Sequence, residues 1–522
     1  MRVHEIDRRA VYLALFIVLI IPFLVRWRFP VYVSPETRAF YEAVERTDDG
    51  KVVLLMSNWG PGTQGENDPQ YRAIVKHLLR GRKKFALISL TDDPIPIAIA
   101  DKITRDLIEE ERKRSSGFRW RYGVEWINLG YKPGPLGTTL QALSTDIWKV
   151  ATRDYTGKEI SSFEIMKGLR TMADVRLFIT CVAGREALDV IGIVKSRYRE
   201  LEVVTATMSI VATSLYPYLD SGQLSGMLDG LRGANEYESM LDPNAPPSPR
   251  VNALTLGHLF LISLVILGNI GYMRAKGRPS PRVSIPPVRM AGERYIIPTA
   301  IGMFLLLFLL DTSLNGWREW DRIGMWIGAF FTISVFSFLF GDNVLYKAVE
   351  HVIVGGAAAL GLYFSVKQVL LPKWWIPMVK GFAGEEGGNW LLVFALIPGA
   401  MWYFTYSRRY GWMSKIIAGA FMGMGAGISL GAMISLVIPL VVGTFKPLSN
   451  PLNLIYVSVT CIVLSYFVFT FGEGKGRIGK GSRYMARISM MIGFGALFGN
   501  TVATRLSWLI DRIAFLLRPL SG

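Results

Sequence analysis

Polar side chains that could contact a ligand follow three predicted strands. The first group lies in residues 57–71, SNWGPGTQGENDPQY, where glycines let a ligand approach the backbone. Ligands of parallel sheets bind beyond the carboxyl ends of the strands, so these side chains form the predicted ligand-binding site of a soluble domain. Its members are Asn58, Glu66, Asn67, Asp68, Asp92, Asp93 and Lys132.

Two plainer interpretations of these residues stay open. Segment 57–71 also fits a polar surface loop with ordinary turn chemistry. Adjacent acids after a strand, as at Asp92 and Asp93, are typical of a loop that caps a helix, although they also suit an acid and base pair.

Patterns that would specify a reaction are missing. HExxH, CxxC and GxxxxGK[ST] do not occur, and the two cysteines, Cys181 and Cys461, cannot form a disulfide framework or a thiolate metal site. We therefore expect no catalytic residue and no metal. The sequence specifies no cofactor, and a non-enzymatic role is favoured.

Residues 29–241 alternate between short apolar runs and helical stretches. Parallel strands need crossover connections, so five such alternations predict an α/β domain of Rossmann-like type, with a doubly wound parallel sheet. The strands are predicted at 52–59, 84–91, 122–130, 175–183 and 201–208, and the helices at 70–81, 94–115, 136–153, 185–198 and 209–240.

The last of these helices carries glycines at nearly helical spacing. Gly222, Gly226, Gly230 and Gly233 predict close contact with another helix or subunit, and the alternative is a broken helix with glycine caps.

The composition of the rest of the chain is typical of a membrane protein. Hydrophobic residues make up 51% of the 522, charged residues 19%, and the mean hydropathy is +0.31. We predict an N-terminal membrane anchor in 1–28, a Pro-rich linker in 242–253, and eight transmembrane helices with an amphipathic C-terminal end in 254–522. The eight runs are 254–273, 295–313, 323–341, 350–371, 389–407, 415–442, 453–472 and 486–510.

Charge sets the predicted orientation. Residues 29–250 hold 29 basic and 29 acidic side chains, so the net charge of +17 lies entirely on the membrane segments and their loops. Of the 29 basic residues there, 18 fall on one side, which the positive-inside rule makes cytoplasmic. This predicts a multi-pass protein of the inner (cytoplasmic) membrane with an extracytoplasmic soluble domain, and argues against a nucleic-acid partner.

Two groups of residues inside the membrane region stand out. Glycines spaced four apart predict a face for tight helix packing, within the chain or between chains. Polar residues near a helix start predict either a cation or proton site or a capped helix with a local ion pair. The packing glycines are Gly419, Gly423, Gly427, Gly431, Gly495 and Gly499, and the polar cluster is Asp342, Asn343, Lys347, Glu350 and His351.

Two segments resemble known sequences. DNVLYKAVEH, at 342–351, together with the later GFGALFGNTVATR, is similar to a group of bacterial multi-pass membrane proteins of unknown activity, over about residues 320–518. GLRGANEYE in the soluble domain resembles a second such set. The resemblance implies a multi-pass membrane protein, and no site residue can be transferred.

Three functions compete. The first is a non-enzymatic subunit of an oligomeric membrane assembly, in contact with the lipid bilayer and with copies of itself or other membrane subunits. The second is a transporter or channel gated by ligand binding to the soluble domain. The third is a membrane-bound enzyme that uses Asp92 and Asp93, for which no nucleophile–base or metal pattern exists.

Overall fold

A computed structural model gives the structure of the chain. It describes residues 8–517 except 26, 28, 48–49, 92, 115–117, 246–247, 276–297, 299–301, 303, 307, 310, 312–319, 341–342, 386 and 468–476. The chain divides into two compact units. One contains residues 1–27, 252–367 and 509–522, and the other contains residues 28–251 and 368–508.

The second unit is organised around a six-stranded sheet. All strand pairs are parallel, in the order β3-β2-β1-β4-β5-β6. This is the order of doubly wound nucleotide-binding folds, in which the winding direction changes between β1 and β4. The strands are β1 Val52–Asn58, β2 Phe85–Ser89, β3 Trp126–Tyr131, β4 Val175–Val182, β5 Glu202–Thr207 and β6 Gly226–Asp229.

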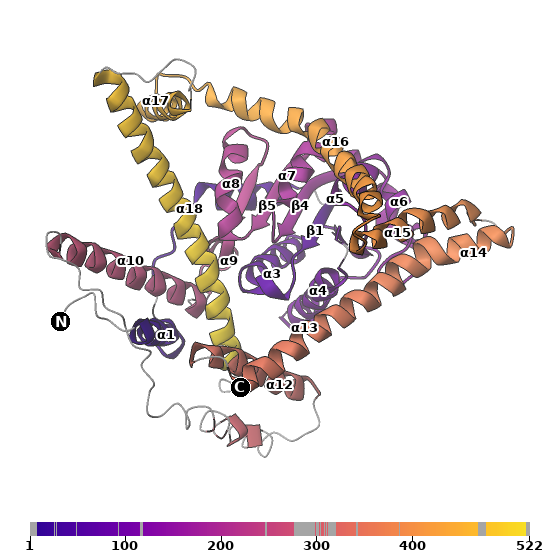
Figure 1. Ribbon diagram of the computed structural model, residues 1–522, viewed down its shortest axis with the longest axis horizontal. Coiled ribbons are helices and arrows are strands. Elements are labelled where there is room, and N and C mark those ends of the chain that lie inside the picture. Colours follow the sequence, from indigo (N-terminus) through magenta and orange to yellow (C-terminus); the bar gives the residue numbers. More distant parts are fainter. Residues whose placement is uncertain are drawn as a thin grey trace. The chain divides into compact units, whose positions relative to one another are not determined.

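Both faces of the sheet are buried under helices. Successive residues of β1 alternate between two hydrophobic cores, with Leu54 in one and Leu55 in the other. Helices α5 to α8 and the π-helical η6 pack on the Leu54 face, and α2, α3, α4 and α9 pack on the Leu55 face (Figure 1). Their bounds are α2 Pro35–Glu45, α3 Gln64–Arg80, α4 Ile95–Arg114, α5 Leu136–Thr145, α6 Ile147–Val150, α7 Glu186–Asp189, η6 Val190–Lys195, α8 Ser209–Asp220 and α9 Gly230–Leu241.

The predicted parallel α/β domain is therefore confirmed, and each predicted strand lies within about four residues of an observed one. Two predictions of local structure are wrong. The helix predicted at 209–240 is α8, a sixth strand and α9, and the polar end of loop 57–71 already belongs to α3. Pro69 lies in the second turn of α3, inside the helix, where proline is normally disfavoured, and this hid the helix start.

Of the four glycines in 222–239, Gly233 lies inside α9, and the other three lie in strand β6, in the turn before it or at the start of α9. A Cβ on Gly226, in β6, would stand 2.3 Å from the backbone nitrogen of Phe40 in α2. Gly230 begins α9 with φ +52°, in the left-handed region that favours glycine. The close approach expected from these glycines exists at Gly226, where helix meets strand, whereas the continuous glycine-faced helix does not form.

Apolar helices make up most of the remaining chain. Three of those described, Pro249–Gly271, Val344–Phe382 and Gly411–Thr444, have the length and composition to cross a membrane. Shorter apolar helices lie at Ala10–Leu24, Ile323–Phe336, Trp390–Tyr406 and Pro451–Tyr466. The elements are α1 Arg8–Leu24, α10 Pro249–Ala275, α12 Trp320–Phe336, η7 Ser337–Phe340, α13 Val344–Phe364, η8 Ser365–Trp375, α14 Ile376–Phe382, η9 Trp390–Ala395, α15 Leu396–Tyr403, η10 Phe404–Tyr406, α16 Gly411–Thr444, α17 Pro451–Tyr466 and α18 Arg477–Leu517.

Substitution of Gly226 by alanine should destabilise the α/β domain. The new methyl group would overlap backbone atoms of α2, which cannot move aside as a side chain can, so we expect a loss of about 1–3 kcal/mol. Gly168→Ala is the matched control, because a Cβ there meets no atom within 4 Å. Thermal unfolding of the full-length protein in detergent measures both, and equal melting temperatures would contradict the close approach.

Candidate functional site

The carboxyl end of β1 is tied to the neighbouring strand. Asn58 Oδ1 accepts the backbone N–H of Leu90 at 2.9 Å and the hydroxyl of Ser89 at 3.2 Å, and Asn58 Nδ2 donates to the Leu90 carbonyl at 3.1 Å. Both ends of this amide are therefore engaged within the protein. Asn58 holds the strand ends in register, and its place as a ligand contact stays a prediction.

Helix α3 lies across the carboxyl ends of β4, β5 and β6. Gln70 Nε2 lies 2.9–3.1 Å from the carbonyl oxygens of Thr207, Leu228 and Gly230, all at or next to strand ends. Asn67 Nδ2 donates to the Val182 carbonyl at 3.2 Å. Buried carbonyls need such partners, so the polar start of α3 closes this edge of the sheet from within.

Asp68 and Asp93 also have local partners. Arg72, one turn later in α3, donates from its Nε to both carboxylate oxygens of Asp68, each at 3.1 Å. Asp93 Oδ1 accepts the backbone N–H of Ile95 at 2.9 Å and so caps the start of α4, as the capping interpretation predicts. Asp92 lies outside the described residues.

Glu66 is the most unusual of the predicted residues. Its side chain is fully buried, and Oε2 accepts the backbone N–H of Ser209 at 2.8 Å, at the start of α8. Oε1 has no hydrogen-bond partner among the described residues. Burial raises the pKa of Glu66 to about 7, and the charge of nearby Asp229 adds to the rise. The pKa of Asp229 is raised by its own burial.

The end of α18 contacts the same region. Thr504 Oγ1 accepts the backbone N–H of Ile210 at 3.0 Å, and Asn500 Nδ2 donates to the hydroxyl of Thr213 at 2.7 Å. Thr504 is buried. The first turns of α8 therefore link the Glu66 carboxyl to a helix nearly 300 residues later in the chain.

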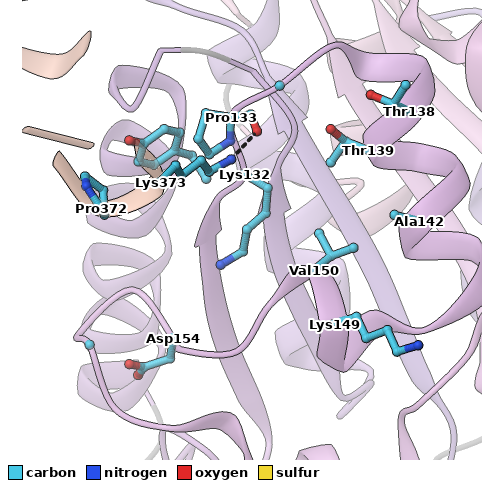
Figure 2. A pocket seen from close by; sticks show the side chains of 13 residues that line it. Lys132, Pro133, Thr138, Thr139, Ala142, Lys149, Val150, Asp154, Pro372 and Lys373 are labelled. Atoms are coloured by element: carbon cyan, nitrogen blue, oxygen red, sulfur yellow. Dashed lines mark hydrogen bonds between the residues drawn. The ribbon is translucent and has the colours of Figure 1, made fainter. Parts of the chain in front are cut away.

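An open cavity lies at the carboxyl end of β3, with a volume of about 840 Å³ (Figure 2). Lys132 enters it directly after β3, Thr138 and Thr139 line it from the start of α5, and Lys149 lies at its far side. Lys373 of η8 completes the wall, with Nζ donating to the Pro133 carbonyl at 2.8 Å. The cavity thus joins the α/β domain to a segment of an apolar helix.

The cavity is electropositive. Asp154 is the acidic residue of its described lining, and its oxygens already accept the hydroxyls of Tyr122 and Thr156 and the backbone N–H of Lys158, at 2.7–2.9 Å. Three lysines line the same space. Burial, and then the charge of Lys373, lowers the pKa of Lys132 to about 8.

The polar cluster near the membrane forms a helix start. Asn343 Oδ1 accepts the backbone N–H of Tyr346 at 2.9 Å and caps α13, and Asn343 Nδ2 donates to Ser337 at 2.9 Å. His351 Nδ1 lies 2.7 Å from the carbonyl of Lys347, and Glu350 is exposed. Asp342 lies outside the described residues, so the predicted cation or proton site stays a prediction.

The packing glycines face open space. A Cβ placed on Gly419, Gly423, Gly427 or Gly431 of α16 meets no atom of the described chain within 4 Å. The same holds for Gly495 and Gly499 of α18. The part of the protein that the structure describes therefore leaves these faces uncovered.

Sequence reasoning found Lys132 but missed its partners. Lys149 lies in a predicted helix, and Lys373 lies 241 residues after Lys132, at the end of an apolar run. Neither spacing nor composition relates them. Asp229 and Thr504 were missed for the same reason, because only the fold brings them near Glu66.

The comparisons with known proteins add no assignment: no family model, curated protein or solved structure matches this chain.

The burial of Glu66 should make stability depend on pH. Its folded pKa, about 7, exceeds its ordinary value of 4.5, so the folded state favours the proton. The resulting stability is fully present below about pH 4.5 and is lost as the pH rises through 7, by about 3 kcal/mol. Glu66→Gln should remove this loss, raising the melting temperature relative to wild type at pH 8 more than at pH 5.

The matched control is Glu164→Gln, at an exposed carboxyl in the same domain. Its melting temperatures should follow the wild-type profile. If Glu66→Gln and Glu164→Gln give the same pH profile, Glu66 does not titrate in the folded protein near neutral pH.

Proposed function

We propose that this protein is a non-enzymatic, multi-pass subunit of an oligomeric membrane assembly, with its α/β domain outside the cytoplasm. The observation that carries the proposal is the uncovered glycine face of α16. Glycines four apart lie on one side of a helix and allow another backbone to come close, and such small-residue faces are a main means of helix association in lipid.

The exposed surface of α16 supports a membrane environment. Phe421, Leu430 and Ile434 each expose more than 60% of their surface along a helix of 34 residues. Each large apolar side chain left in water forgoes about 1.5–3 kcal/mol of burial, so a helix of this kind needs hydrocarbon or a protein partner around it. The large apolar side chains can contact lipid hydrocarbon, and the glycine face can pack against a neighbouring helix.

Contacts within the unit that holds the sheet agree with the orientation expected from charge. The α/β domain contacts Lys373 and also Lys446, which pairs with Asp220 at 3.4 Å. If the apolar runs alternate across the membrane, both contacting segments emerge on the side of residues 29–250. The positive-inside assignment makes that side extracytoplasmic.

A ligand-gated transporter or channel is the second candidate. One observation favours it, namely that the cavity at β3 takes Lys132 from the α/β domain and Lys373 from η8. A ligand there would contact both the soluble domain and a segment of a predicted membrane helix.

Single cysteines test the orientation. In a background with Cys181→Ala and Cys461→Ala, Glu109→Cys lies on an exposed part of α4, and Ser280→Cys lies in the basic loop. An impermeant maleimide added to intact spheroplasts should label position 109, whereas position 280 should react only after permeabilisation. The reverse pattern would place the α/β domain in the cytoplasm.

Leucines on the glycine face test the assembly. Gly423→Leu with Gly427→Leu should push a neighbouring helix outward and lower the particle mass measured by multi-angle light scattering in mild detergent. Gly425→Leu is the control, since residue 425 lies about 200° around the helix from 423. A wild-type mass of one 58.3 kDa chain would refute the oligomer. A folded double variant with the wild-type mass would place the glycine contact elsewhere.

A further inference from the structure

We propose that Glu66 is a proton-binding site that controls how tightly the end of α18 packs on the α/β domain. With a proton on the carboxyl, α18 stays packed beside the start of α8. Without the proton, this contact weakens and water reaches the carboxyl. Glu66 and the contacting residues of α18 belong to one compact unit of one chain, so this coupling is independent of the assembly proposed above.

The Glu66 carboxyl is buried with one oxygen unmatched. None of the side chain is exposed, and Oε2 accepts the backbone N–H of Ser209 at 2.8 Å. Oε1 has no hydrogen-bond partner among the described residues. A Cβ on Gly230 would stand 3.0 Å from Oε2, so the start of α9 also closes this space. An ionised carboxylate loses its hydration here without full compensation, and the neutral acid loses much less.

Two hydroxyl groups of α18 lie near the same carboxyl. Thr504 and Ser507 both influence its titration, and each is only 1% exposed. Ser507 Oγ, like Glu66 Oε1, has no hydrogen-bond partner in the part of the chain that the structure describes. A protonated carboxyl carries an O–H donor, and a serine hydroxyl can accept it. The proton therefore supplies a bond between α3 and α18 that the ionised carboxylate lacks as a donor.

The charges around Glu66 do not compensate a carboxylate there. Asp229, at the end of β6, repels it. Arg232 of α9 is the nearby cation, but it lies 3.4 Å from Asp229, 3.5 Å from Glu36 of α2 and 3.3 Å from Glu236. One positive charge is thus shared by three carboxylates other than Glu66. The described hydrogen-bond partner of Glu66 is a backbone N–H, not a cation.

Three further groups of the surrounding helices have partners elsewhere. The Tyr216 hydroxyl of α8 donates to a carboxylate of α2 at 3.0 Å. Arg505 of α18 stacks on Trp508, 4.5 Å from the ring centroid. Asp68 of α3 pairs with the arginine one turn later. The proton is therefore the remaining means of neutralising Glu66 among the described groups.

Burial is the largest cause of the raised pKa of Glu66, about 7 against an ordinary 4.5. The charge of Asp229 adds to the rise, whereas hydrogen bonding by Ser209, Ser507 and Thr504 opposes it. If the end of α18 moves away, water hydrates the carboxyl and its pKa falls toward 4.5. Packing of α18 is then strongest below about pH 4.5 and weakens as the pH rises through 7. The packing equilibrium can change by up to about 300-fold over this range.

A cysteine in the contact measures the packing. Ala503 is 8% exposed and lies about 60° around α18 from Asn500 and about 40° from Ser507. Ala503→Cys, in full-length detergent-solubilised protein with Cys181→Ala and Cys461→Ala, is treated with maleimide from pH 5 to pH 8. Each labelling rate is divided by the rate of the same protein with Glu66→Gln, which cancels the ionisation of the thiol. This ratio should rise about tenfold or more between pH 5 and pH 8.

Two variants control the experiment. Glu164→Gln, at an exposed carboxyl, should keep the wild-type rise. Asp229→Asn should lower the pH at which labelling accelerates, because it removes a charge that raises the pKa of Glu66. This variant is referred to a small-molecule thiol, so it remains informative if Glu66→Gln does not fold. A ratio that stays constant from pH 5 to pH 8, or an unchanged midpoint in Asp229→Asn, overturns the proposal.

Discussion

The carbonyl oxygens at the ends of β4, β5 and β6 have no further strand residues to pair with, and they are buried. Gln70 and Asn67 supply the missing donors from the start of α3. An unpaired buried carbonyl costs about 1–3 kcal/mol, so this arrangement is a condition for the sheet to end where it does. It also decides where a ligand can enter, because the edge that α3 closes is the one where a doubly wound sheet usually binds its ligand.

Because the start of α3 covers this edge of the sheet, a carboxyl side chain of α3 is buried in the interior. Glu66 shares the first turns of α3 with Asn67 and is carried under α8, where the N–H of Ser209 meets one oxygen and the other stays unpaired among the described residues. A carboxyl in that position favours the neutral form. Its neighbourhood includes the end of α18, since Thr504 contacts Ile210 next to Ser209. The protonation state of Glu66 and the contact between α18 and Ile210 therefore both affect the first turn of α8.

The sequence predicted the parts of this fold that depend on local pattern. Runs such as VVLLMSN and VRLFITCV are mostly apolar, with five of seven and six of eight positions, and do not alternate between apolar and polar residues, as expected of a sheet buried on both faces. Strand β6 escaped prediction because it has four residues, begins with Gly226 and lies at the sheet edge, where a strand needs little β-branched character. Its glycines suggested a helix because the spacing of four can also arise by chance in a turn and a strand.

The candidate site was predictable only where chain order and spatial order agree. The rule that ligands lie beyond strand ends found Lys132, which follows β3 directly. The same rule selected Asn58, Asn67 and Asp68, whose hydrogen-bonding groups hold strand ends or a neighbouring arginine, and their contact with a ligand stays a prediction. Both sets are polar residues after strands. What separates them is whether a carbonyl or cation of the protein lies within reach, and this depends on tertiary contacts.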